Sequence, residues 1–229
     1  MNSTKKRIFL VEDHRLVREG VTHFIGQEDD LIVCGGAANG ADALTAIEML
    51  KPDAVLCDIS LPGMNGIEFL KNLKAKHPGM VAVVLSMHDE AIYAERALRA
   101  GALGYVMKRE SAEEVIIALR KALRGEFHVS EKITGIIFHK ALGADGSAKH
   151  ATRSPVELLS DRELEVFEML GRGMTMRAIA QALSLSPKTV ESHRAHIKEK
   201  LQFQTVSDIL QHAIRWVEHE SAGNGNGSR

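Results

Sequence analysis

Acidic residues that could hold a divalent metal ion follow two separate apolar runs in this chain. Glu12 and Asp13 end the run Ile8-Phe9-Leu10-Val11, and Asp58 ends the run Ala54-Val55-Leu56-Cys57. Crowded carboxylates repel one another unless a cation lies among them, and a hard dication such as Mg2+ suits an all-oxygen site. A carboxylate held beside such an ion can attack phosphorus and become an acyl phosphate. These three residues could therefore hold a metal ion and a phosphoryl group together.

Strand-like and helix-like segments alternate through the first half of the chain. The strands are short and almost continuously apolar, which is typical of a parallel sheet covered on both faces. We predict strands at 7-12, 30-37, 53-58, 80-87 and 102-106, and helices at 15-26, 39-50, 65-76, 90-99 and 111-124. Five strand-helix units with right-handed crossovers predict an α/β fold, an open doubly wound five-stranded parallel sheet.

Two further strands of this predicted sheet end at Ser86 and close to Lys108. Ligands of doubly wound sheets bind outside the carboxyl ends of the strands. We therefore expect Glu12, Asp13, Asp58, Ser86 and Lys108 to gather at one edge. His14 follows the acidic pair, but magnesium prefers oxygen ligands, so we interpret His14 as a loop residue.

The length leaves room for one large domain or two small ones, and the sequence gives no sign of export or membrane insertion. The chain has 229 residues and a net charge of -1. No run approaches the ~20 apolar residues that a membrane helix requires, and the start does not resemble a signal peptide. We expect Cys34 and Cys57 to be thiols in strands, as in a reducing cytoplasm.

The strand-helix alternation stops near Gly125. We assign residues 1-125 to the first domain, and 126-156 to an extra helix at 130-140 followed by a small, polar, flexible linker. Residues 157-218 read as a second domain of four helices, and 219-229 as a disordered tail. In the second domain Ser160 and Glu163 form a capping-box pattern, and Ser186-Pro187 starts the third helix, which is expected to end near Leu201.

The second and third of these helices are separated only by the turn Ser184-Leu185-Ser186, which predicts a helix-turn-helix. The third helix is locally basic in a domain that is neutral overall, and this fits contacts with phosphates. The acidic side chains of the first helix, including Glu163, are expected on a different face.

The first 125 residues resemble the receiver domain of bacterial two-component response regulators. The match comprises Glu12-Asp13, the stretch Asp58-Ile59-Ser60-Leu61-Pro62-Gly63-Met64-Asn65-Gly66, Ser86, Tyr105 and Lys108. Residues 159-217 resemble the LuxR-type helix-turn-helix through Leu159-Ser160-Asp161-Arg162-Glu163 and Lys188-Thr189-Val190-Glu191-Ser192-His193. Together they resemble the NarL/FixJ family of transcription regulators, with one departure: Arg109 follows Lys108 where many receivers have proline.

The resemblance implies a function and a set of site residues. Asp58 would accept a phosphoryl group from a sensor histidine kinase, and Glu12, Asp13, Asp58 and the Ser60 carbonyl would hold Mg2+. Ser86, Tyr105 and Lys108 would couple phosphorylation to output, namely homodimerisation, binding to an inverted repeat in double-stranded DNA and action on RNA polymerase. The expected DNA-facing residues of the third helix are Lys188, Thr189, Glu191, Ser192, His193, Arg194, Ala195 and Lys198.

Two other classes of function use similar residues. An aspartyl-phosphate phosphotransferase or phosphatase also has strand-end aspartates and Mg2+, but it usually carries a second acid-base aspartate close to the nucleophile. Here Ser60 stands two residues after Asp58, which argues against an enzyme. A phosphorylation-independent DNA-binding or scaffold protein is the other class, and intact Asp58 and Lys108 argue against it.

Overall fold

The computed structural model describes residues 4–141 and 155–223. The chain divides into two compact units, Met1–Gly143 and Ala144–Arg229, which we describe separately. Most of the predicted flexible linker (142–154) and the end of the predicted tail (224–229) lie outside the described residues. Within those residues, no helix combines the length and the apolar character that crossing a membrane demands.

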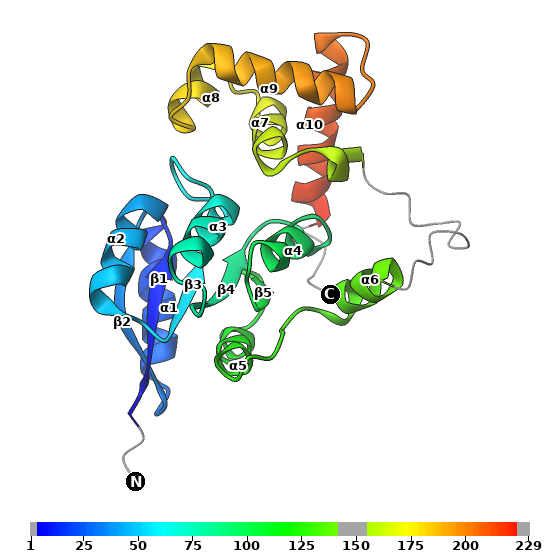
Figure 1. Cartoon of the computed structure of the whole chain (residues 1–229). Helices are drawn as coiled ribbons and strands as arrows, with labels where there is room; N and C mark the ends of the chain where they lie inside the picture. The colour runs from blue at the N-terminus through cyan, green and yellow to red at the C-terminus, as the bar shows by residue number, and fades with distance from the viewer. Residues whose placement is uncertain (1–3, 142–154, 224–229) are drawn as a thin grey trace. The chain divides into compact units, whose positions relative to one another are not determined.

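The first unit contains the predicted five-stranded parallel sheet, with the strand order β2-β1-β3-β4-β5. Its strands are β1 (Lys6–Val11), β2 (Leu31–Ala37), β3 (Ala54–Cys57), β4 (Val81–Ser86) and β5 (Gly104–Met107). The helices between and after them are α1 (Arg15–Gly26), α2 (Gly40–Leu50), α3 (Gly66–Lys76), α4 (Glu90–Arg99) and α5 (Ala112–Leu123). The doubly wound fold predicted from the alternation is therefore confirmed (Figure 1).

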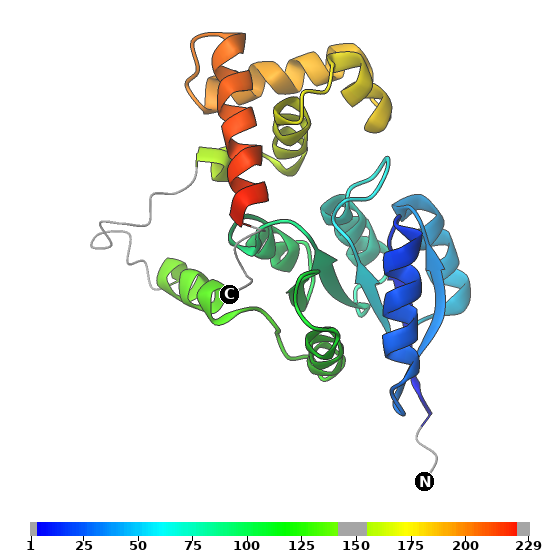
Figure 2. The ribbon, with the colours of Figure 1, turned by 180° about the vertical axis from the view of Figure 1, so that it is seen from behind.

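Alternate residues of each strand point to opposite faces of the sheet, and both faces are buried. Ile8 and Leu10 of β1 pack with Ile25 of α1 and Leu119 of α5 in one core cluster. The helices α2, α3 and α4 cover the other face (Figures 1 and 2). Because helices cover both faces, the polar side chains that follow the strands lie beyond the strand ends and not on a face of the sheet.

Helix starts agree with local capping chemistry. The side chain of Asn39 accepts a hydrogen bond from the Asp42 amide at 2.9 Å, and that of Asn65 accepts one from the Glu68 amide at 2.8 Å. Each asparagine satisfies an amide in the first turn that has no partner within its own helix. α2 and α3 therefore begin one residue after the asparagine with which the sequence prediction started each helix.

The turn between β3 and α3 brings two stretches of backbone into close contact. A Cβ atom on Gly66 would lie 2.1 Å from the Asp58 carbonyl oxygen and 2.7 Å from the Ile59 Cα. The Gly66 amide also donates to the Ile59 carbonyl at 2.8 Å. Only glycine permits this approach, so Gly66 holds the segment that carries Asp58 against the start of α3.

The segment after α5 is attached to the edge of the sheet. The His128 amide donates to the Leu103 carbonyl at 2.8 Å, and the Tyr105 amide donates to the His128 carbonyl at 2.9 Å. Helix α6 (Glu131–Ala141), the extra helix predicted from the sequence, then packs against α4. The structure thus groups α6 with the first unit, whereas the sequence had indicated that it belongs with the linker.

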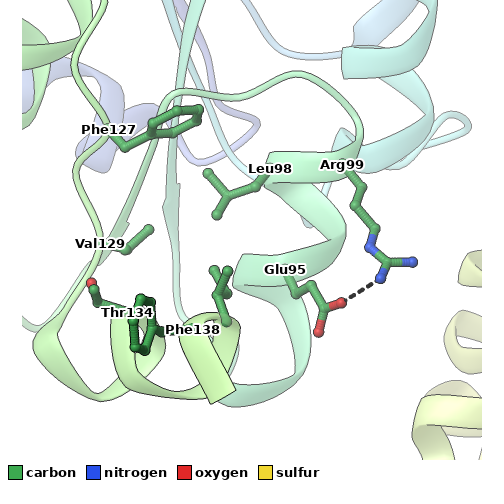
Figure 3. A pocket seen from close by; sticks show the side chains of 8 residues that line it. Glu95, Leu98, Arg99, Phe127, Val129, Thr134 and Phe138 are labelled. Carbon is green, nitrogen blue, oxygen red and sulfur yellow. Dashed lines mark ion pairs between the residues drawn. The ribbon is translucent and has the colours of Figure 1, made fainter. Parts of the chain in front are cut away.

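An apolar cavity of about 690 Å³ lies between α4 and α6 (Figure 3). It is lined by Glu95, Leu98, Arg99, Phe127, Val129, Thr134, Ile137 and Phe138. Glu95 and Arg99 form an ion pair of 2.7 Å on α4. The cavity lacks the paired carboxylates and the lysine of the predicted phosphorylation site, so it is a separate feature of this unit.

The second unit is helical, as predicted. Its elements are the 3-10 turn η1 (Pro155–Leu158), α7 (Asp161–Gly171), α8 (Met176–Ala182), α9 (Pro187–Lys200) and α10 (Val206–Gly223). The predicted capping box is present, because Ser160 accepts from the Glu163 amide at 3.3 Å and Glu163 accepts from the Ser160 amide at 2.7 Å.

Helix α10 is longer than expected. The sequence prediction ended this helix near Val217 and began a disordered tail at residue 219, but α10 continues to Gly223. The residues that follow Val217 are compatible with a helix, and Gly223 is the first strong helix breaker after them. Residues 219–223 therefore belong to the helix and not to the predicted tail.

Candidate functional site

The register of the sheet gathers the predicted residues at one edge. The Asp58 amide donates to the Val11 carbonyl at 2.9 Å, so Asp58 lies beside the end of β1, which Glu12 follows. The Lys108 amide donates to the Ser86 carbonyl at 2.8 Å, which joins the ends of β4 and β5 in the same way. The strand-end prediction for these four residues is thus reproduced by the backbone.

Lys108 lies between two buried carboxylates. Its Nζ is 2.6 Å from Glu12 Oε2 and 2.8 Å from Asp58 Oδ2. Only 6% of Glu12 and 3% of Asp58 is exposed to solvent. Burial lowers the pKa of the Lys108 ammonium, but the attraction of Asp58 and Glu12 outweighs burial and raises that pKa above its ordinary value. The site therefore contains a fixed positive charge beside the predicted phosphoacceptor.

The acidic pair supplies oxygen atoms suited to a cation. Ligand atoms of Glu12, Asp13 and His14 all lie within 4.8 Å of one another. The Oδ1 atom of Asp13 is buried and makes no hydrogen bond within the described residues, although the His14 Nδ1 atom lies 2.8 Å from it. A buried carboxylate oxygen that accepts no hydrogen bond in the described part of the chain and lies beside a second carboxylate fits a hard dication such as Mg2+.

The contacts of His14 and Asp58 show how each residue lies beside the acidic pair. His14 lies in the loop before α1, as the sequence indicated, and its ring approaches both acids, with 3.3 Å from Nδ1 to Glu12 Oε1. The position of His14 directly after the acidic pair is the sequence feature that pointed to this contact. Asp58 is not one of these three residues; its Oδ1 accepts from the Ile59 amide at 2.6 Å, and its Oδ2 contacts Lys108 at 2.8 Å.

The remaining predicted receiver residues converge on His88, a residue that the sequence patterns did not mark. Ser60 is exposed, and its Oγ lies 2.8 Å from His88 Nε2. Ser86 is fully buried, and its Oγ accepts from the His88 amide at 3.2 Å. The Tyr105 ring is also buried, and its hydroxyl donates to the His88 carbonyl at 2.8 Å, so Tyr105 is turned inward in this structure.

In the second unit, the helix-turn-helix consists of α8, the turn at Ser184 and α9. Ser186 caps α9 by accepting from the Thr189 amide at 3.1 Å, and Pro187 occupies the first turn. Val190 and Ile197 of α9 are buried in the domain, which leaves the opposite side of the helix open. The exposed predicted residues are Lys188, Thr189, Glu191, Ser192 and Ala195, and the half-buried ones are His193, Arg194 and Lys198.

Ion pairs divide the basic residues of α9 into two groups. Arg194 pairs within its own helix, with Glu191 at 3.1 Å. Lys200 instead lies 2.6 Å from Glu163 of α7, and therefore ties α7 to α9. The expectation that Glu163 belongs on a different face is wrong, because packing of the two helices brings it to α9.

Burial lowers the pKa of His193, so this imidazole is kept largely neutral near pH 7.

Comparison with known proteins agrees with this architecture. Residues 8–120 match the response regulator receiver domain, and residues 157–213 match the luxR family of bacterial regulatory proteins. The chain is 30% identical to the oxygen regulatory protein NreC of Staphylococcus carnosus over 91% of this chain and 97% of that protein. It is also 30% identical to the transcriptional regulatory protein DegU of Brevibacillus brevis, over 95% of this chain and 98% of DegU. The chain belongs to the NarL/FixJ family of response regulators.

Solved structures support the same assignment. A LuxR-family two-component response regulator from Aurantimonas sp. SI85-9A1 is 31% identical, with a TM-score of 0.57, over 61% of this chain and 99% of that one. RcsB from Salmonella enterica serovar Typhimurium, solved bound to the promoter rprA, has the same fold with a TM-score of 0.65. The match covers 92% of this chain and 98% of the RcsB chain, with 22% sequence identity. The family consists of DNA-binding transcription regulators, which confirms that this protein is not an enzyme.

Proposed function

We propose that Asp58 accepts a phosphoryl group from a histidine of a sensor kinase and that this controls DNA binding by the second unit. The observation that carries the proposal is the Lys108 ammonium, which bridges Asp58 and Glu12 at the carboxyl edge of the sheet. A fixed cation there can pair with phosphoryl oxygens as charge develops on them. NreC and DegU, which match almost the whole chain, are named as regulatory proteins, and this supports the assignment.

In the proposed transfer, an Asp58 carboxylate oxygen attacks phosphorus in line with the phosphohistidine nitrogen. The new O–P bond forms as the N–P bond breaks, and the electron pair of that bond returns to the imidazole of the kinase. Glu12, Asp13, Asp58 and the Ser60 carbonyl would hold Mg2+, which when bound neutralises the negative charges of carboxylates and phosphoryl group. Lys108 contacts the transferred group, and the Ser86 hydroxyl donates a hydrogen bond to it.

The switch would act through Tyr105. Its inward ring, hydrogen-bonded to the loop after β4, represents one of two arrangements of the α4–β5–α5 surface. A phosphoryl group that engages Ser86 and Lys108 favours one arrangement over the other by its differential affinity. The receiver then passes this change to the second unit as a change in dimerisation.

The proposed output is a homodimer on DNA. Val206, Leu210 and Ile214 lie four residues apart on α10 and remain 41%, 38% and 42% exposed. A stripe with this spacing forms one side of a helix and suits contact with a second copy. Two copies related by a two-fold axis would present two α9 helices to an inverted repeat in double-stranded DNA.

Within α9, the proposed roles follow the exposure of each side chain. Glu191, Ser192 and Ala195 would face base edges, whereas Lys188, Thr189, His193, Arg194 and Lys198 would contact phosphates or make mixed contacts. A regulator bound in this way would act on RNA polymerase at the promoter, in the cytoplasm. RcsB was solved bound to promoters in the presence of a phosphomimetic, which supports this proposal by analogy of fold.

Phosphorylation with a small acyl-phosphate donor and Mg2+ tests the proposal. We expect one phosphoryl group per chain by intact mass, none in Asp58→Asn, and none with a chelator present. Asp53→Asn is the matched control, because Asp53 flanks the other end of β3 and pairs with Lys6 at 3.0 Å. Equal labelling of Asp58→Asn would disprove the assignment of the phosphoacceptor.

DNA capture separates this function from phosphorylation-independent binding. We expect the wild-type protein to bind an inverted repeat more tightly after phosphorylation, and Asp58→Asn to lose that response. Equal promoter occupancy by both proteins would favour a degenerate receiver that serves as a scaffold.

A further inference from the structure

Residue 88 contacts three parts of the proposed phosphorylation machinery at once. Its amide donates to Ser86 Oγ at 3.2 Å, its carbonyl accepts from the Tyr105 hydroxyl at 2.8 Å, and its ring nitrogen Nε2 lies 2.8 Å from Ser60 Oγ. His88 is 8% exposed, and its imidazole also packs on Tyr93, with 4.5 Å between ring centroids. The loop after β4 is thus connected to the loop that follows Asp58.

Only one of these three hydrogen bonds depends on the residue type. Any residue at position 88 except proline has the amide that reaches Ser86, and every residue has the carbonyl that reaches Tyr105. The contact with Ser60 requires a side chain that carries a polar atom at the reach of Nε2. Replacement of His88 or Ser60 therefore separates the cross-loop contact from the backbone contacts.

We propose that His88 is a positioning residue, which transmits the state of the Asp58 loop to Ser86 and Tyr105 through its hydrogen bond with Ser60. The inference rests on the proposed phosphorylation of Asp58 and adds the route by which that phosphorylation changes Ser86 and Tyr105. The His88 amide holds Ser86 Oγ as an acceptor, so the hydroxyl hydrogen of Ser86 remains available to a phosphoryl oxygen. The His88 carbonyl holds Tyr105 inward, and the Ser60 contact holds residue 88.

The surroundings make this route effective. The contacts of His88 with Ser86 and Tyr105 are buried, and hydrogen bonds in such surroundings are electrostatically stronger than in water. The contact with the exposed Ser60 is partly buried. Ser60 stands two residues after Asp58, so a shift of that loop on phosphorylation moves the Ser60 hydroxyl. If the Ser60 hydroxyl is removed, the His88 ring loses this hydrogen bond, and the loop after β4 loses its side-chain contact with the loop after Asp58.

Fluorine NMR of the full-length chain labelled with 3-fluorotyrosine tests the transmission directly. The chain has two tyrosines, Tyr93 and Tyr105, so Tyr105→Phe assigns both signals. In the unphosphorylated protein we expect Ser60→Ala to shift or broaden the Tyr105 signal, and Ser60→Thr, which keeps the hydroxyl, to restore it. An unchanged Tyr105 signal in Ser60→Ala would overturn the proposal, whatever the protein does with phosphate.

A double-mutant cycle on the phosphorylated protein gives the second test. The response is the ratio of dimer dissociation constants before and after phosphorylation, with labelling of each variant checked by mass. We expect Ser60→Ala and His88→Ala each to lower this ratio roughly two- to tenfold, the range for one hydrogen bond. The double variant should lose no more than the larger single loss, because both changes remove the same contact.

Two controls keep the outcomes distinct. His88→Gln places an amide near the position of Nε2 and should retain more of the response than His88→Ala. His23→Ala removes an exposed histidine of α1 that contacts Gln27 at 3.1 Å, and should leave the response unchanged. If the losses of response in the two single variants multiply in the double variant, the proposed role of His88 is overturned. If neither the wild type nor any variant becomes phosphorylated at Asp58, the proposed function itself is disproved.

Discussion

The Nζ atom of Lys108 lies 2.8 Å from Oδ2 of Asp58, and fifty positions in the chain separate the two residues. The pair forms because β3 and β5 end at the same edge of a parallel sheet, with β4 between them. Lys108 also contacts Glu12, so one ammonium compensates two buried carboxylates. From this arrangement we derive expectations for the stability of the site and for its proposed reaction with a phosphoryl donor.

Lys108→Ala should therefore destabilise the first unit when no divalent ion is added. Two buried carboxylates would lose their cation, and breaking a buried pair costs on the order of 3 kcal/mol. Urea titration with chelator measures the loss, and Mg2+ should restore part of it. The variant should still accept some phosphate but respond poorly in DNA binding. A midpoint equal to that of the wild type in chelator would contradict the assigned pairing.

Gly66→Ala should disturb the Asp58 loop without touching any charge. The added Cβ would lie 2.1 Å from the Asp58 carbonyl oxygen, so the backbone must move. We expect a loss of roughly 1–3 kcal/mol of unfolding free energy, the usual cost of overpacking, together with slower phosphorylation. Gly79→Ala is the control, since nothing lies within 4 Å of the position that a Cβ atom would take there. Wild-type phosphorylation in Gly66→Ala would argue against a tightly held loop.

The stability of the first unit should fall as the pH drops below about 6.5, the ordinary pKa of histidine. Burial lowers the pKa of His128, and although Glu114 at 2.9 Å opposes this, the net direction is downward. A lowered folded-state pKa means that the unfolded chain binds more protons, so stability is present above the unfolded pKa and is lost towards the folded one. His128→Gln should show a smaller fall in urea midpoint between pH 7 and 5 than the wild type and His23→Gln.

Salt dependence should separate the two groups of residues on α9. Lys188→Ala and Arg194→Ala should weaken DNA binding and reduce the slope of log affinity against log salt by about 0.9 for each phosphate that the variant no longer binds. Glu191→Ala and Ser192→Ala should change sequence preference with little change in slope. Lys200→Ala is the control, because Lys200 pairs with Glu163 within the domain. An unchanged slope in both Lys188→Ala and Arg194→Ala would exclude the proposed groove contacts.

Leu210→Glu should prevent dimerisation in the phosphorylated full-length protein. The side chain is 38% exposed in the middle of the α10 stripe, so a charge there is solvated in the monomer but buried in a dimer. Sedimentation should show monomers, with an unfolding midpoint close to wild type. Gln211→Glu places the same charge next to the stripe on an exposed residue and should leave the dimer intact. Dimers of Leu210→Glu would move the interface elsewhere.

The sequence by itself determined the order and type of the elements. Local chemistry decides these: apolar runs of strand length, the caps at Asn39, Asn65, Ser160 and Ser186, and the turn before α9. It also placed Glu12, Asp58, Ser86 and Lys108 at strand ends, and the parallel topology then brings strand ends together. Boundaries were predicted less accurately, as α10 shows, because a helix end depends on several weak preferences.

Tertiary structure alone decided which side chains meet. His88 joins Ser60, Ser86 and Tyr105 because two loops approach one another, and no periodicity in the sequence marks that approach. Glu163 meets Lys200 because α7 packs on α9, although the two residues are 37 positions apart. Such pairings depend on the geometry of packed elements over distances of a few ångströms, whereas sequence patterns report only which face of its own element each residue occupies.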